Sequence, residues 1–146
     1  MLTLTLIVGV LVSLAFYEVT GVVAGAIIAP GYIALLLDDP RALLAILVAV
    51  VATHVVVSLI SNALFLYGTR RLSVTILVGL VFATGISALQ GEMASELLVW
   101  AGLGYIVPGL IAHQWYRQGL LPTLLALAIA APLTRLITLG IAMVAP

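Results

Sequence analysis

Five arginines carry all of the permanent positive charge in this chain of 146 residues, which contains no lysine. Three of them, Arg70, Arg71 and Arg117, stand in short polar joints between apolar runs. Positive charge there attracts anions, so these residues are candidates for drawing in a polyanion or docking a partner. Arg135 lies well inside the last apolar run, where an unpaired charge is costly. We expect it to form an ion pair or to bind a ligand, and snorkelling to the surface is the alternative.

Two Pro-Gly pairs, Pro30-Gly31 and Pro108-Gly109, lie in the middle of apolar runs. Proline lacks an N–H and clashes with the carbonyl four residues earlier, so each pair should kink or break its helix. Proline suits the first turn, so a new half-helix would present its positive end and free N–H groups near mid-membrane. Such ends can hold anionic groups, which makes the four residues candidates for an anion passage, with Arg135 as a further candidate. A merely kinked packing helix is the alternative.

The remaining polar residues point to few other chemistries. Glu18 and Glu96 lie at the ends of apolar runs, where a solvated or capping carboxylate is the default and a role in the passage is the alternative. The absence of cysteine excludes disulfides and thiolate catalysis, and the absence of lysine excludes a P-loop. Two isolated histidines without a ligand spacing favour no metal site. The net charge of zero gives no sign of nucleic-acid binding.

The composition places these residues in a lipid-embedded protein, because 65% of the chain is hydrophobic and only 7% is charged. Six runs of roughly helical span length lie between the polar joints. They cover about residues 2 to 17, 19 to 37, 42 to 67, 72 to 90, 95 to 114, and 120 to 145. The runs lack the alternation of a lipid-facing strand, so we predict an all-α integral membrane protein. Short joints predict one up-and-down transmembrane domain over residues 1–146.

The two halves of the chain resemble each other. A shift of 78 positions places Glu18 on Glu96, Pro30 on Pro108 and Gly31 on Gly109. If halves 1–71 and 72–146 each cross the membrane three times, they form an inverted repeat of three plus three helices. If the Pro-Gly segments are re-entrant, each half crosses twice and the repeats are parallel.

The arginine distribution also predicts an orientation. Arg70, Arg71 and Arg117 fall on one face and Arg41 falls on the other, which favours the first face as cytoplasmic and places both termini outside.

A series of short motifs runs from the first apolar run to Gly119: Glu18-x-Thr20-Gly21, Pro30-Gly31-Tyr32, Tyr67-Gly68 with Arg70-Arg71, Gly102-x-Gly104-x-Ile106-Val107-Pro108-Gly109-Leu110-Ile111-Ala112, and Gln118-Gly119. Taken together, these motifs resemble those of the PgsC/CapC family, the small membrane subunits of the bacterial poly-γ-glutamate synthetase. The chain departs from the family pattern in having Thr69 before its arginine pair, and in His113 and Arg135, which are not part of that pattern.

The resemblance implies a multi-pass subunit in the plasma membrane of a prokaryote. It implies two partners, a cytoplasmic amide ligase of the PgsB/CapB type that uses ATP and Mg, and a PgsA/CapA-type protein. Catalysis and cofactors would then belong to the ligase, with none in this chain, and the chain could also form a homo-oligomer. We expect the subunit to dock the ligase and to help pass the anionic capsule polymer across the membrane. An independent secondary transporter of a small anion and a passive scaffold for the ligase are the alternatives.

Overall fold

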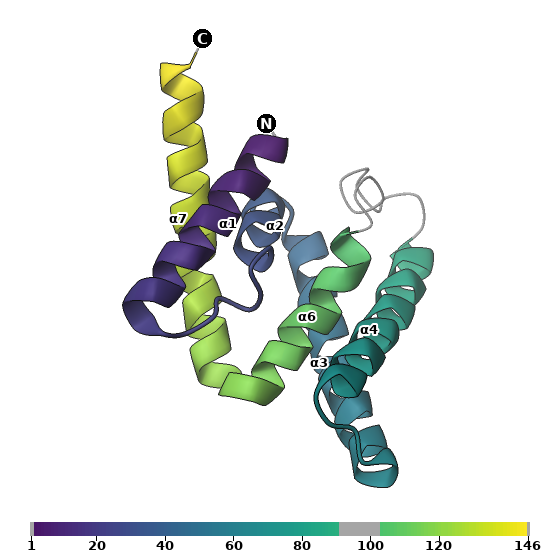
Figure 1. Ribbon diagram of the computed structural model, residues 1–146. Helices are drawn as coiled ribbons and strands as arrows, with labels where there is room; N and C mark the ends of the chain where they lie inside the picture. The colour runs from purple at the N-terminus through teal and green to yellow at the C-terminus, as the bar shows by residue number, and fades with distance from the viewer. Residues whose placement is uncertain (1, 91–102, 146) are drawn as a thin grey trace.

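The computed structural model describes residues 2–90 and 103–145, and all of the regular structure in those ranges is α-helical (Figure 1). The helices are α1 (Leu2–Thr20), α2 (Ala29–Leu36), α3 (Pro40–Leu64), α4 (Thr69–Gln90), α6 (Leu103–Gln118) and α7 (Leu120–Val144). The prediction of an all-α protein is confirmed. Glu96 and Gly102 lie outside the described residues.

Four of the described helices, α1, α3, α4 and α7, are long and apolar enough to cross a membrane. The other two are shorter: α2 has 8 residues and α6 has 16. At 1.5 Å per residue they span only about 12 and about 24 Å. The described part of the chain therefore does not confirm six full spans. Many large side chains on the long helices point outwards, such as Leu44, Val48 and Leu59, each more than half exposed. That distribution suits helices surrounded by lipid rather than water.

The second predicted run breaks at Pro30, as expected. Helix α1 continues to Thr20, and the chain then turns at Gly21, whose φ of +70° favours glycine. The Thr20 hydroxyl donates to the Phe16 carbonyl at 2.6 Å and accepts from the Val22 N–H at 3.2 Å, which closes the end of α1. After a non-helical stretch over residues 21–28, α2 begins with Pro30 in its first turn.

The break expected at Pro108 is wrong. Pro108 lies inside α6, which has already begun at Leu103. Little more than one turn precedes the proline, so it removes only the backbone hydrogen bond to the carbonyl of Gly104. Among the described residues, a helix begins at the Pro-Gly pair in α2, and no second half-helix begins at Pro108.

The third helix of each half packs against the other half. Helix α7 packs on α1 and α2, whereas α3 packs on α4 and α6 (Figure 1). The short helices α2 and α6 also contact each other. Their buried residues Tyr32 and Ile111 share one apolar cluster with Ile46 of α3 and Leu127 of α7. The two halves are therefore interleaved around the short helices.

Glycines allow each short helix to lie directly on a long one. A Cβ added to Gly9 of α1 would stand 2.3 Å from the Gly31 Cα, and one added to Gly79 of α4 would stand 2.7 Å from the Gly109 Cα. Close backbone approach through small residues is a common way for helices to pack in membranes. The glycine of each Pro-Gly pair therefore forms a helix contact.

Candidate functional site

The predicted basic residues gather at the end of the bundle where α4 begins and α6 ends. A cavity of about 370 Å³ lies there, lined by Gly68, Thr69, Arg71, His113, Tyr116 and Arg117 among others. Gly68 adopts a φ of +57°, which lets the chain turn sharply into α4. The structure thus brings Arg71 and Arg117 into one pocket, although they lie on different helices. Arg70 is exposed next to Arg71 and does not line the cavity.

Arg71 is almost completely buried, with 5% of its surface exposed. Its guanidinium carbon lies 3.3 Å from the centroid of the Tyr116 ring, in a cation–π contact. Its Nε is buried and has no hydrogen-bond partner among the described residues. The pocket therefore holds a cation whose charge no described carboxylate neutralises, since the ion pair found in residues 2–90 and 103–145 joins other residues.

A second buried atom of the cavity wall is also unpaired. The Nδ1 of His113 is buried and lacks a hydrogen-bond partner within the described residues. Two positions further along α6, Trp115 stacks on His54 of α3, with ring centroids 4.0 Å apart and planes 1° from parallel. This stack holds α6 against α3 beside the cavity. The pocket consequently has two fixed polar groups, Arg71 and His113, and an exposed Arg117 at its rim.

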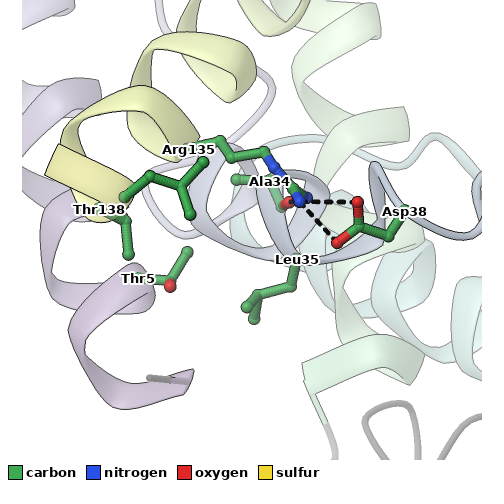
Figure 2. Close-up of a pocket in the computed structure, with 7 residues that line it drawn as sticks. Thr5, Ala34, Leu35, Asp38, Arg135 and Thr138 are labelled. Atoms are coloured by element: carbon green, nitrogen blue, oxygen red, sulfur yellow. Dashed lines mark hydrogen bonds and ion pairs between the residues drawn. The ribbon is translucent and has the colours of Figure 1, made fainter. Parts of the chain in front are cut away.

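Arg135 lies in a different pocket and forms an ion pair. Its Nη2 donates to both carboxylate oxygens of Asp38 at 2.6 and 2.7 Å, and its Nη1 donates to the Ala34 carbonyl at 3.3 Å (Figure 2). Thr5 of α1 and Thr138 of α7 line the same cavity, which has a volume of about 190 Å³. The expected ion pair of Arg135 is therefore present, with a partner that the sequence analysis had not singled out because it lies far away in the chain.

The two pockets are alike in part, since the end of a short helix lines each of them, although residues of α7 line only the pocket at Arg135. The shift of 78 positions that aligns the Pro-Gly pairs also aligns Leu35 with His113 and Asp38 with Tyr116. Each pocket lies between the beginning of a long helix and the end of the short helix that packs on it. The first pocket contains the ion-paired Arg135, and the second contains Arg71 and Arg117, which pair with no carboxylate in the described part of the chain.

The Gln118-Gly119 motif fastens the non-helical stretch after α1. The Gln118 side-chain amide donates to the Val23 carbonyl and accepts from the Val23 N–H, so it satisfies both backbone polar groups of Val23. Gln114 donates to the same amide oxygen at 3.1 Å. Gly119 has a φ of +93°, which permits the sharp turn into α7. This motif has an architectural role that links the two halves.

The other predicted site residues fall in three environments. Pro30, Gly31, Pro108 and Gly109 are all buried. Tyr32 is also buried, and its hydroxyl has no hydrogen-bond partner in the described part of the chain. Glu18 is exposed near the end of α1, Tyr67 is exposed in the joint between α3 and α4, and Gly104 lies in the first turn of α6. Contact between these residues and a polymer stays a prediction.

Comparison with known proteins identifies the family. The family model described as capsule biosynthesis CapC matches residues 8–124. The chain belongs to the CapC family. It is 37% identical over 120 residues to the PGA biosynthesis protein CapC of Bacillus subtilis (strain 168), covering 82% of this chain and 80% of that protein. It is 36% identical, with the same coverage, to the capsule biosynthesis protein CapC of Bacillus anthracis. No solved structure matches the chain.

Proposed function

We propose that this CapC-family protein is a membrane subunit of a complex that makes and exports a poly-γ-glutamate capsule. The observation that carries the proposal is the positive charge at one end of the bundle. Arg71 and Arg117 share a pocket, with Arg70 beside it, where α4 begins and α6 ends. Charges are balanced where α2 ends and α3 begins, because Asp38 pairs with Arg135 and Asp39 stands two residues before Arg41. A basic end attracts a polycarboxylate, and the positive-inside rule favours this end as cytoplasmic.

The basic end is also the surface that we propose for ligase docking. Arg70 and Arg117 are exposed there and belong to different helices, so a partner could contact both. The partner we propose is an amide ligase that binds ATP and Mg and adds glutamate to the polymer. A second partner, of the PgsA/CapA type, would act on the outer side. In this division of labour the chain is a non-catalytic subunit.

We further propose that the chain is an inverted repeat. Three features support this proposal. The Gly9–Gly31 contact has its counterpart in the Gly79–Gly109 contact. Buried Thr5 and Thr75 occupy matching places, because the carbonyl of each faces the glycine of a Pro-Gly pair. In Figure 1, α1 descends from the N-terminus whereas its counterpart α4 rises, and α3 descends whereas its counterpart α7 rises to the C-terminus.

The passage that we propose for the polymer runs between the short helices. Helices α2 and α6 carry the two Pro-Gly pairs and contact each other in the middle of the bundle. Their surroundings are apolar and closely packed, so transport requires the short helices to separate. The first turn of α2 offers a positive helix end on this path, and no corresponding end begins at Pro108.

Removing two charges from the basic end tests the proposal. We expect the double variant Arg70→Gln and Arg117→Gln to reach the membrane in normal amount, to lose co-purification with the ligase, and to lower secreted polymer several-fold, because it removes two exposed charges without disturbing packing. The matched control is Arg41→Gln, an exposed arginine at the start of α3. The measurements are the chain in the membrane fraction, the co-purified ligase and the polymer per cell. Polymer and ligase at wild-type levels in the double variant would contradict the proposal.

Replacing the protein by an unrelated membrane anchor distinguishes a polymer passage from a passive scaffold. The ligase is tethered to the membrane through an unrelated single helix in cells that lack this chain. We expect polymer to accumulate inside these cells and to be absent from their surface. Polymer on the surface would show that the chain serves only as an anchor.

A further inference from the structure

We infer that the cavity at Arg71 is a carboxylate-binding subsite, which holds one free carboxylate of a γ-linked glutamate chain. The inference rests on the proposed function for the identity of the ligand. It goes further in assigning a specific site at the buried Arg71, in a cavity that the exposed Arg117 also lines. Two observations carry it: a buried cation that pairs with no carboxylate of residues 2–90 and 103–145, and a second buried polar atom in the same cavity wall that has no partner in those ranges.

The charge of Arg71 requires an anion. A guanidinium stays protonated at every physiological pH, so burial cannot neutralise it. Burying a charge without a partner is strongly unfavourable, and the Tyr116 ring offsets only part of this cost. Among the described residues, the carboxylate that pairs with an arginine belongs to Asp38, and its partner is Arg135. An anionic ligand in the cavity would supply the missing charge.

The geometry favours a carboxylate bound to one edge of the guanidinium. Tyr116 covers one face of the Arg71 guanidinium at 3.3 Å, which leaves the in-plane N–H groups for binding. The unpaired Nε belongs to that edge, where two parallel N–H groups can meet the two oxygens of a carboxylate. The His113 Nδ1 can donate a further hydrogen bond when it carries the proton. The first turn of α4 borders the cavity at Thr69 and adds the positive end of a helix.

The volume of the cavity limits how much of the polymer can bind in it. Its volume of about 370 Å³ lies near the lower end of the range for small-molecule sites, roughly 300 to 1,000 Å³. It can take one or two glutamate residues rather than a folded length of chain. Arg117 at the exposed rim lies where the carboxylate of a neighbouring residue would emerge. The cavity therefore fits the end of a chain or one residue of a passing chain.

Binding to the full chain alone tests the inference. The protein is purified into nanodiscs of phosphatidylcholine, and a γ-linked glutamate pentapeptide is titrated in by calorimetry. We expect saturable binding, and no binding of the same pentapeptide with its α-carboxylates converted to amides. Arg71→Gln should weaken binding about ten- to hundredfold, since it removes a charge-assisted pair of hydrogen bonds. Arg71→Lys keeps the charge and should also weaken binding, because a lysine cannot form the paired edge.

Controls keep the result interpretable if Arg71→Gln fails to fold. Arg41→Gln at the other end of the bundle should bind the pentapeptide like wild type. His113→Leu removes the second polar group from a partly exposed position, and should weaken binding severalfold while leaving the protein folded. Wild-type binding in both the Arg71→Lys and His113→Leu variants would overturn the inference.

A second titration distinguishes the carboxylate from a phosphate. Glycerol phosphate is titrated into the same nanodiscs, and the pentapeptide titration is repeated with one third of the lipid replaced by phosphatidylglycerol. Unchanged pentapeptide affinity supports a carboxylate site. Abolished pentapeptide binding together with tight binding of glycerol phosphate would assign the cavity to a lipid headgroup and overturn the inference. These measurements involve no ligase, so their failure is distinct from a failure of the secretion experiment.

Discussion

Replacing Gly79 by alanine should loosen the contact between α4 and α6. The new Cβ would stand 2.7 Å from both the Cα and the amide nitrogen of Gly109, whereas ordinary Cβ contacts begin at 3.4 Å. The helices must therefore separate by about 0.7 Å, because the obstructing atoms belong to the backbone and cannot rotate away. Gly85 lies on the same helix, and a Cβ there meets nothing within 4 Å. Gly85→Ala is thus a matched control.

The expected magnitude follows from two opposing effects. Overpacking costs about 1–3 kcal/mol of the free energy of unfolding. Replacing a helical glycine by alanine gains up to about 1 kcal/mol, and this gain applies to both variants. The difference between Gly79→Ala and Gly85→Ala therefore isolates the packing cost and should be about 1–3 kcal/mol. Gly9→Ala should behave like Gly79→Ala, because its Cβ would stand 2.3 Å from the Gly31 Cα.

Unfolding in mixed micelles measures these differences. The purified variants are titrated with SDS, and unfolding is followed by tryptophan fluorescence. Equal free energies of unfolding for Gly79→Ala and Gly85→Ala would refute the close approach of α4 and α6. A large loss for Gly79→Ala with none for Gly9→Ala would refute the equivalence of the two glycine contacts.

Two further variants test the long-range contacts in the same assay. Asp38→Asn should lower the free energy of unfolding by no more than about 1 kcal/mol, and less at high salt, because the Asp38 side chain is 75% exposed and that of Arg135 is 31% exposed. A loss of several kcal/mol would mean that this ion pair is buried in the native protein. Gln118→Ala should cost about 1–3 kcal/mol, since it leaves the Val23 N–H and carbonyl without their partner. Gln114→Ala removes only a bond to Gln118 and should cost less, so equal losses for the two variants would contradict the pairing with Val23.

The interleaving of the halves bears on how a passage could open. Because α7 packs on α1 and α2, and α3 packs on α4 and α6, neither half can move as a unit without sliding past a helix of the other. The short helices have few turns and lie at the centre of this arrangement. We therefore expect movement to be local to α2, α6 and the stretch over residues 21–28, which Gln118 fastens at Val23.

Local sequence was sufficient for the class of the protein and for one helix break. Continuous apolar runs require helices in lipid, because every backbone polar group must be satisfied within its own segment. Pro30 begins α2 because the non-helical stretch that starts at Gly21 leaves the proline in a first turn, where its missing N–H costs nothing. The basic joints were also visible, since Arg70, Arg71 and Arg117 are close to helix ends in the sequence itself.

The local sequence does not predict that α6 continues through Pro108 or that Arg71 is buried. Pro108 has the same local motif as Pro30, yet it lies inside α6. A helical turn precedes it, and Gly109 packs on α4 without a break in the helix. Arg70 and Arg71 are adjacent and chemically identical. The position of α6 decides that Arg70 is exposed while Arg71 is buried against Tyr116.

The sequence by itself determined that this protein is helical, apolar enough for lipid, basic at two joints and interrupted at Pro30, because each property depends on residues within a few turns of one another. Only the tertiary structure decided that Arg135 meets Asp38, that Gln118 holds Val23, and that Arg71 and His113 share a cavity. Those pairings depend on which helix faces lie together. Lipid-facing and protein-facing apolar side chains look alike in a sequence, so hydrophobic patterning carries little information about helix faces in a membrane protein.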